Sequence, residues 1–300
     1  MDFRQLHYFV AVVEEGSLSA ASRRVHIAQP ALTRQIHALE EKLQVALFER
    51  HTRGMTLTVA GRALYEDAGK MLENRDQVVA RIRALGQGLT GKVTLGVTVS
   101  HLWVPDIRRL LARFRDHYPQ VALEVYPLLS GPQGEKLKDG TIDAGFLYLE
   151  EPAPDYLHSH RFHRDHLVLA VPAGSPLASS PPGRVKALNG LDFVWGPRHS
   201  SPLYYDRLSA HFDRLGLEPR VVQQGADNIT ILSLVAAGLG ISIVPGDCRW
   251  SSPPGVHFID LAELRECDMS IHFAWNRHNH SPALQNFIHI VQGSPVPADG

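Results

Sequence analysis

The stretch GSLSAASRRVHIAQPALTRQI, residues 16–36, decides the fold of the first part of this chain. Gly16 suits the left-handed end of a preceding helix, and Ser17 can then cap the start of a second one. That second helix, over residues 18–25, is short and rich in serine and alanine, so a neighbouring helix can approach it closely. We therefore interpret the stretch as the centre of a helix-turn-helix.

Two further helices flank this short one, each with one apolar face. Before it, apolar side chains follow the helical spacing at Leu6, Phe9, Val10 and Val13. After a turn at residues 26–28, they repeat at steps of four, three and four at Leu32, Ile36, Leu39 and Leu43. Pro30 is compatible with the first turn of the later helix, where its missing N–H has no partner to lose.

The polar side chains at the start of the third helix are candidates for contact with DNA. Gln29, Thr33 and Arg34 lie off the apolar stripe, where a recognition helix meets the major groove. A β-hairpin wing over residues 48–58, with a basic tip at Arg53-Gly54, is expected to reach the minor groove. The alternative is a plain three-helix bundle with a polar outer face.

The first sixty residues resemble the LysR-type transcriptional regulators. The resemblance rests on Phe3-Arg4-Gln5-Leu6, Gly16-Ser17-Leu18-Ser19-Ala20-Ala21, Gln29-Pro30-Ala31-Leu32-Thr33-Arg34-Gln35-Ile36, Leu47-Phe48-Glu49-Arg50 and Leu57-Thr58-Val59-Ala60-Gly61. It implies that the DNA contacts are Gln29, Pro30, Ala31, Thr33, Arg34, Arg50 and Arg53. The family usually has serine where this chain has Ala28, and an alanine cannot cap the helix, a loss of about 1 kcal/mol.

Residues 59–89 predict one long helix that joins the two parts of the chain. They contain no proline, and apolar residues recur with the 3.5-residue period of a coiled coil, interrupted by Arg75. We expect this seam to pair two copies through Leu64, Met71, Val78, Ile82 and Leu85, so that a homodimer presents two recognition helices to an interrupted palindrome. The family resemblance implies that dimers assemble into tetramers.

The rest of the chain, residues 90–300, predicts an α/β domain in two lobes. Strand and helix patterns alternate, which favours a largely parallel sheet. The predicted fold class is therefore α/β, with an all-α-type winged helix-turn-helix over residues 1–58 and a two-lobed, periplasmic-binding-protein-like C-terminal domain. The first lobe is expected over 90–161 and 269–300, and the second over 162–268. The LysR resemblance continues here at residues 141–146 and 234–245.

Hydroxyl and amide side chains at strand ends and helix starts predict an effector site between the lobes. Helix starts favour a small carboxylate, and the chain resembles the branch of the family that responds to carboxylates of aromatic catabolism. Tyr204 is expected to lie flat against such a ligand, and Asp227 to disfavour a second anionic group unless it points away. The candidate contacts are Thr98, Ser100, Ser130, Ser201, Pro202, Tyr204 and Asn228. The alternative for each hydroxyl is an ordinary helix cap.

Composition limits the other classes of function. The 300 residues carry a net charge of −1, yet residues 23–53 hold six basic and three acidic side chains. We expect no signal peptide, no membrane span and no cofactor, and therefore a cytoplasmic protein whose partners are DNA, an effector, its own copies and, as a further candidate, RNA polymerase. Cys248 and Cys267 lack metal-ligand spacing, with a redox disulfide as the alternative.

Two other functions compete with DNA binding. A metal-dependent protein would use the histidines at 158, 160, 163 and 166, but arginines rather than carboxylates crowd them. A cytoplasmic solute-binding protein would share the two-lobed fold, but it would not need the helix-turn-helix.

Overall fold

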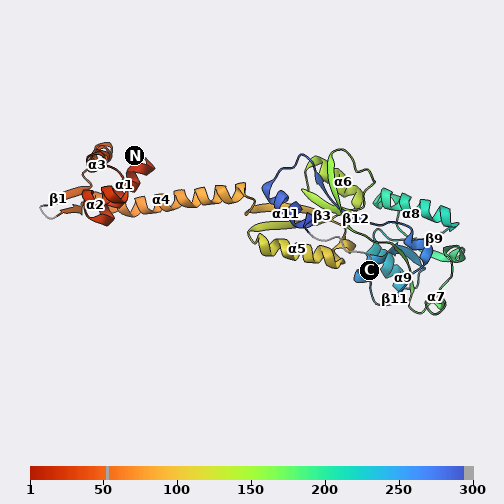
Figure 1. The fold of residues 1–300 in the computed structure, drawn as a ribbon. Helices are drawn as coiled ribbons and strands as arrows, with labels where there is room; N and C mark the ends of the chain where they lie inside the picture. Colours follow the sequence, from red (N-terminus) through yellow and green to blue (C-terminus); the bar gives the residue numbers. More distant parts are fainter. Residues whose placement is uncertain (52–53, 294–300) are drawn as a thin grey trace. The chain divides into compact units, whose positions relative to one another are not determined.

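The computed structural model describes residues 1–51 and 54–293, and divides the chain into two compact units, Met1–Ala84 and Leu85–Gly300. In the first unit three helices precede a two-stranded hairpin and the long helix α4 (Figure 1). The elements are α1 (Phe3–Glu15), α2 (Leu18–Arg24), α3 (Gln29–Leu43), β1 (Phe48–His51), β2 (Gly54–Leu57) and α4 (Val59–Gly86). The predicted winged helix-turn-helix is confirmed.

The local sequence explains how these helices begin and end. Gly16 ends α1 in the left-handed region at φ 67°, and the Ser17 hydroxyl accepts a hydrogen bond from the amide of Ala20 at 3.2 Å. Ala28 precedes α3 without a side-chain cap, as its methyl group requires. The Thr58 hydroxyl accepts a hydrogen bond from the amide of Gly61 at 2.9 Å. A Cβ on Gly61 would stand 2.1 Å from the carbonyl oxygen of Leu47. Glycine is therefore needed where the start of α4 approaches the backbone just before β1.

The core of the first unit is built from the predicted apolar faces. Leu6 and Phe9 of α1 are buried with Leu32, Ile36 and Leu39 of α3. The first half of α4 joins them, because Ala68 is fully buried and Leu64 packs against the same cluster. Leu64 was expected at the dimer seam, but its side chain already has an apolar environment within its own chain.

From Met71 onward, α4 leaves most of its apolar side chains exposed to solvent. Met71, Val78, Ile82 and Leu85 are 43%, 40%, 58% and 44% exposed. At about 1.5 Å per residue, the helix is roughly 42 Å long. Within the described residues of the first unit, no other element covers Met71, Val78 or Ile82.

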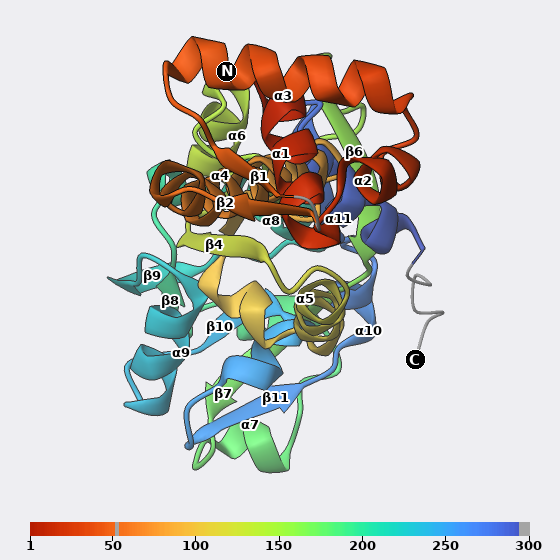
Figure 2. The same cartoon turned by 90° about the vertical axis from the view of Figure 1, so that its left-hand side faces the viewer.

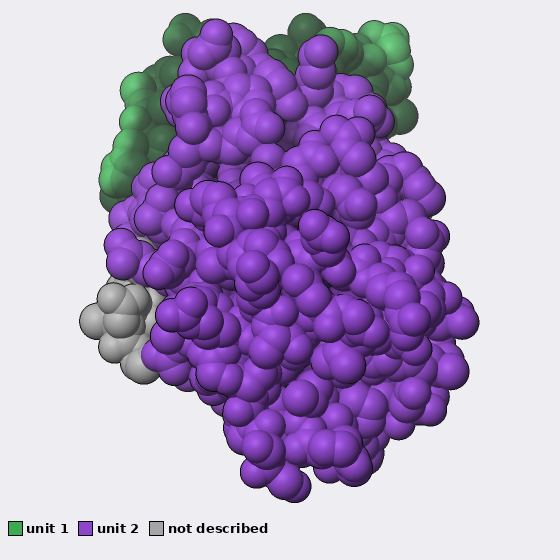
Figure 3. Space-filling model, turned by 90° about the vertical axis from the view of Figure 1, so that its right-hand side faces the viewer, with its two compact units in different colours: residues 1–84 green, residues 85–300 purple. Residues whose placement is uncertain are grey.

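The second unit, purple in Figure 3, contains the two predicted lobes. The first lobe has a five-stranded sheet in the order β4-β3-β5-β12-β6. Its strands and helices are β3 (Gly91–Val97), η1 (Val99–Trp103, a 3₁₀ helix), α5 (Pro105–His117), β4 (Val121–Pro127), α6 (Ser130–Asp139), β5 (Ala144–Leu147), β6 (Leu157–His163), β12 (Ile271–Asn276) and α11 (Pro282–Gln292).

Helices cover both faces of this sheet. The Phe287 ring of α11 lies 4.8 Å from Phe114 of α5 and 5.5 Å from Phe273 of β12. The next residue of β12, Ala274, faces the other way and packs with Leu137 of α6. The alternation of side chains along β12 thus separates an α5–α11 face from an α6 face.

The prediction of a largely parallel sheet is only partly right. β3 runs parallel to β4 and β5, but β12 is antiparallel to both β5 and β6. The reason is the path of the chain: β6 leads to the second lobe, and β12 returns from it in the opposite direction. β6 also extends two residues past the predicted lobe boundary at 161, since His163 pairs with Ile271.

The second lobe contains two small sheets. β7 lies between β10 and β11 and is antiparallel to both, while β8 and β9 are parallel (Figure 2). A bridge between Phe193 and Ile241 links the sheets. The elements are β7 (Leu167–Pro172), α7 (Pro176–Ser179), η2 (Val185–Leu188), β8 (Asp192–Trp195), η3 (Arg198–Ser200), α8 (Pro202–Leu215), β9 (Arg220–Gln224), α9 (Asn228–Ala236), β10 (Ser242–Pro245), η4 (Gly246–Ser251), β11 (Val256–Ile259) and α10 (Ala262–Arg265).

Candidate functional site

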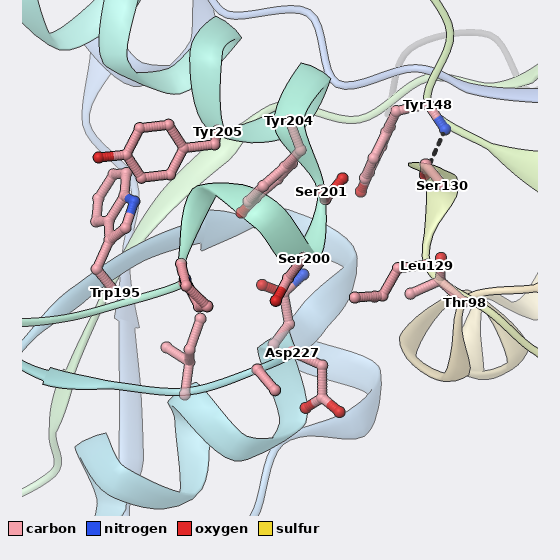
Figure 4. Close-up of a pocket in the computed structure, with 15 residues that line it drawn as sticks. Thr98, Leu129, Ser130, Tyr148, Trp195, Ser200, Ser201, Tyr204, Tyr205 and Asp227 are labelled. Carbon is pink, nitrogen blue, oxygen red and sulfur yellow. Dashed lines mark hydrogen bonds between the residues drawn. The ribbon is translucent and has the colours of Figure 1, made fainter. Parts of the chain in front are cut away.

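A cleft between the lobes collects residues from the ends of strands and the beginnings of helices (Figure 4). It consists of two adjoining depressions, each with about 500 Å³ of atom-free space when its open mouth is included. Both are lined by Thr98, Leu129, Asp227 and Asn228. The upper depression, between α6 and α8, adds Ser130, Tyr148, Trp195, Ser201, Tyr204 and Tyr205; the lower one, beside η1, adds Ser100.

Six of the seven predicted effector contacts line this cleft. The exception is Pro202, which is exposed and lines neither depression. Its Cδ lies 3.5 Å from the point where a Cβ on Gly131 would stand, so it contacts the opposite lobe. Pro202 therefore acts where the lobes meet and not in the lining itself.

The aromatic part of the lining was largely missed by the sequence analysis. Tyr148 follows β5, and its ring stacks on Tyr204 with centroids 5.6 Å apart and planes inclined by 23°. One face of Tyr204 is thus taken by Tyr148 before any ligand arrives. Trp195 ends β8 and packs edge-on against Tyr205 at 6.2 Å. The same strand-end criterion that selected Thr98 would have selected Tyr148 and Trp195.

Unused hydrogen-bonding groups surround the upper depression. Neither α6 nor α8 has a side-chain cap. The amides of Ser130, Gly131, Leu203 and Tyr204, in their first turns, have no partner among the described residues, and of these four residues Ser130 and Tyr204 line the depression. The Ser130 hydroxyl accepts from the amide of Tyr148 at 3.0 Å, which leaves its own proton available.

The lower depression contributes a second free group. Ser100 is only 5% exposed, and within residues 1–51 and 54–293 its hydroxyl has no hydrogen-bond partner. A buried hydroxyl without a partner costs free energy unless water or a ligand satisfies it. Thr98, by contrast, donates to the carbonyl oxygen of Leu128 at 3.3 Å.

The charge of the cleft is unusual for a site expected to bind an anion. Of the described residues that line either depression, Asp227 is the one with a carboxylate, and none is a lysine or arginine. Asp227 precedes α9, and its Oδ1 accepts from the amide of Thr230 at 2.7 Å. Asn228 lies beside the hydroxyl of Tyr204, whose pKa burial raises well above the ordinary value.

A separate charged cluster lies where the chain crosses between the lobes. His163 Nε2 is 2.8 Å from Asp247 Oδ2, and His163 Nδ1 is 3.3 Å from Asp106. Asp165 accepts the amides of His166 at 2.7 Å and Asp247 at 3.0 Å. Burial, with the nearby Asp247 carboxylate, raises the pKa of Asp165 to about 7.

Two histidines near this cluster have pKa values that are shifted in opposite directions. Burial lowers the pKa of His163, but contact with Asp247 outweighs it and holds that pKa above the ordinary value. Burial lowers the pKa of His101 to about 4, and this ring packs edge-on against Tyr148 at 5.0 Å. No group of three potential ligands that could hold a metal ion occurs in the described part of the chain.

The other histidines and the two cysteines singled out in the sequence lie outside the cleft lining. His158 packs on Trp275, and His166 Nε2 lies 3.5 Å from Asp260. Cys248 and Cys267 are free, buried thiols, and burial raises the pKa of both. Within the described residues, none of the helices has the length and apolar character needed to cross a membrane.

The start of α3 presents the predicted DNA contacts to solvent. Gln29, Pro30 and Arg34 are exposed, and Ala31 and Thr33 are half-buried. Arg34 forms no ion pair with any described residue, whereas Arg24 of α2 is 2.6 Å from Glu14. Arg50 belongs to β1, and Arg53 lies outside the described residues.

Comparison with known proteins gives matches over both units. Residues 3–62 match the family model of the bacterial regulatory helix-turn-helix protein, lysR family, and residues 86–294 match the LysR substrate binding domain. The HTH-type transcriptional regulator TdfR of Cupriavidus pinatubonensis is 35% identical over 294 residues, which are 97% of this chain and 98% of that protein.

Solved structures agree with these matches. The crystal structure of CbnR, a LysR family transcriptional regulator, aligns with a TM-score of 0.82 and 30% identity over 97% of this chain and 100% of that one. Full-length CbnR complexed with its target DNA gives the same score and identity, over 97% of this chain and 99% of that one.

Proposed function

This chain belongs to the LysR family of bacterial DNA-binding transcriptional regulators, and on that premise we propose how its two sites divide the work. The start of α3 reads operator DNA through Gln29, Thr33 and Arg34, with Pro30 and Ala31 against the groove. The cleft binds a small organic carboxylate, and occupancy of the cleft changes the protein's affinity for the operator. The protein acts in the cytoplasm, where its DNA is.

Arg34, which is exposed and forms no ion pair with any described residue, supports the DNA-binding half of the proposal. A guanidinium matches guanine or phosphate in geometry, and an exposed one is accessible to either. Gln29 beside it is suited to adenine. The solved complex of CbnR with its target DNA adds a relative of the same family in which the full-length protein binds DNA.

One observation carries the effector half: uncapped starts of α6 and α8 from opposite lobes line one cavity. Free amides at a helix start favour a carboxylate. The Ser130 and Ser201 hydroxyls add donors, and the aromatic lining adds apolar contact. A carboxylate between the lobes would contact both at once, which links ligand binding to their relative orientation.

The exposed apolar stripe on α4, from Met71 to Leu85, supports pairing of two copies. Met71, Val78, Ile82 and Leu85 would bury their side chains against a second α4. Two copies present two recognition helices, and we propose an interrupted palindrome as the operator. Pairing of dimers into a tetramer and contact with RNA polymerase complete the proposed set of partners.

The cleft is tested with the double variant Ser100→Ala, Ser130→Ala. We expect the transcriptional response to the ligand to fall at least about tenfold. Binding to the chain's own upstream intergenic DNA without ligand should stay unchanged. The matched control is Ser179→Ala, Ser180→Ala, which removes two exposed hydroxyls outside the cleft. An unaltered response in the cleft variant, with a normal thermal melt, would refute the site.

A gel shift separates the regulator from the two alternatives. The wild-type chain should retard its upstream intergenic DNA at nanomolar concentration. A solute-binding protein or a metal-dependent protein without DNA binding would leave that fragment unshifted. A thermal-shift screen of mono- and dicarboxylates then finds ligands, because binding to the folded state raises its apparent stability.

A further inference from the structure

The distribution of charge in the cleft narrows the chemistry of the ligand. At the α6–α8 end, attraction for an anion comes only from helix amides and hydroxyl groups. These partial charges amount to about half a unit per helix. Two helix starts can therefore balance about one carboxylate. No lysine or arginine among the described lining residues is available for a second.

The opposite end of the cleft carries the reverse sign. Figure 4 shows the Asp227 carboxylate directed away from Ser130 and Tyr148. Its Oδ1 caps α9 through Thr230, while Oδ2 has no hydrogen-bond partner within the described residues. A second carboxylate on a ligand would face this oxygen and be repelled by it.

A hydrogen-bond donor on the ligand would instead satisfy two groups at this end. It would donate to Asp227 Oδ2, a charged acceptor. The Ser100 hydroxyl, 5% exposed and without a partner in the described part of the chain, also lines this depression. Between the two ends, the lining is apolar and aromatic, with Tyr204 and Ile231.

We propose that the effector is an aromatic monocarboxylate with a hydrogen-bond donor, a hydroxyl or an ammonium group, at the end away from its carboxylate. The carboxylate lies at the starts of α6 and α8, and the donor lies at Asp227. This inference rests on the proposed function of the cleft. It excludes dicarboxylates as the preferred class, because the helix starts balance only one carboxylate and Asp227 repels a second.

The experiment compares three probes that share one ring: benzoate, 4-hydroxybenzoate and terephthalate. Calorimetry on the full-length wild type should give 4-hydroxybenzoate about tenfold tighter binding than benzoate, because a hydrogen bond to a charged acceptor is worth about that factor. 4-(Aminomethyl)benzoate tests the ammonium form of the donor. Terephthalate should bind at least roughly tenfold more weakly than benzoate, because of its second charge.

Asp227→Asn identifies the group responsible. Asparagine caps a helix as well as aspartate does, so the variant keeps the bond to Thr230 and should fold normally. Its binding of terephthalate should strengthen roughly tenfold, and its preference for 4-hydroxybenzoate over benzoate should shrink to about threefold or less. The control is Asp213→Asn, the same change at an exposed position of α8 outside the cleft, which should alter none of these constants.

The outcomes distinguish the ligand class from the cleft itself. If wild type binds terephthalate as tightly as 4-hydroxybenzoate, the proposed class is wrong. If Asp227→Asn changes nothing, the class is also wrong. If all four probes fail while another carboxylate binds in a way that Ser100→Ala, Ser130→Ala weakens, the class fails and the cleft stands. If a bound carboxylate is indifferent to that double variant, the proposed cleft fails first.

Discussion

The start of α3 and the starts of α6 and α8 use the same helix geometry in two different ways. All three lack a side-chain cap. At α3, Pro30 has no N–H, and the amide of Ala31 bonds to the carbonyl oxygen of Ala28 at 2.9 Å. The backbone is therefore largely satisfied, and exposed side chains are left to make contacts. At α6 and α8 the first-turn amides that have an N–H lack partners among the described residues, and the side chains around them are small or aromatic.

This difference teaches what each surface can select. Exposed Gln29 and Arg34 can reach base edges and phosphates over a long polyanion. The starts of α6 and α8 meet at a cavity lined with aromatic groups, for which we propose a single small anion as the ligand. Arg34 adds a positive charge to the first surface, while Asp227 adds a negative charge to the second. The uncapped helix starts therefore differ in two respects: how exposed they are, and whether the charged side chain beside them is positive or negative.

The largest expected effect tests whether DNA binding requires the dimer while ligand binding does not. Ile82→Asp places a charge in the exposed α4 stripe, where Ile82 is 58% exposed. Dimers should dissociate, and operator binding should weaken more than about a hundredfold, because two half-sites no longer act together. Ligand binding in the cleft should persist, since every lining residue comes from one chain. Analytical ultracentrifugation, gel shift and calorimetry measure the three quantities.

Ala80→Asp is the control for this change. It adds the same charge two residues away, about 200° around the helix from Ile82. It should leave the dimer intact. A dimer that survives Ile82→Asp at micromolar concentration would show that the stripe on α4 is not the seam.

The next effect concerns DNA alone. Arg34→Ala removes the exposed guanidinium of α3, and operator affinity should fall roughly ten- to a hundredfold with weaker salt dependence if phosphate is its partner. Ligand affinity should not change. Arg113→Ala, which removes an exposed arginine of α5, provides the matched control. Equal operator affinity in wild type and Arg34→Ala would remove this residue from the DNA-binding surface.

The two surfaces also differ in how far the sequence could predict them. The α3 surface follows from one helical period, because Leu32, Ile36 and Leu39 are buried and fix which side faces out. The cleft joins segments far apart in the sequence, so only strand ends and helix starts could suggest it. Applied to hydroxyl and amide side chains, that criterion found Ser100 and Ser130, but it was not extended to the aromatic Tyr148, which also follows a strand and stacks with Tyr204. The antiparallel β12 was missed because direction depends on the return path from the second lobe.

A pH effect of intermediate size is expected for the effector unit. The raised pKa of Asp165, about 7, means that the folded chain holds a proton that the unfolded chain has lost above pH 4. The stability that this proton contributes is therefore lost as pH rises through 7. Between pH 6 and 8 the free energy of unfolding should fall by about 1 kcal/mol. The raised pKa of His163 acts in the same direction.

Thermal melts at pH 6, 7 and 8 measure this dependence. The melting temperature of the second unit should fall by about 2–4 °C over the range. Asp165→Asn should flatten the slope, since asparagine does not titrate. Asp165 faces His163 and Asp247 and accepts the amides of His166 and Asp247. Its carboxylate also interacts electrostatically with Tyr148, Tyr204 and Cys248. An unchanged slope in the variant would assign the pH dependence to another group.

The smallest expected effects come from adding a hydroxyl at the start of α3 and removing one at the start of α8. Ala28→Ser supplies α3 with a hydroxyl, but the amide of Ala31 is already bonded and Pro30 has none to offer. The gain should therefore be about 0.5 kcal/mol, at the low end for a cap. Ser201→Ala makes the reverse change at α8, where the hydroxyl makes no capping bond, so stability should stay within about 0.5 kcal/mol while carboxylate affinity falls severalfold. Melting curves with and without benzoate measure both variants. A loss of about 1 kcal/mol or more in Ser201→Ala without ligand would mean that its hydroxyl supports the helix and not the ligand.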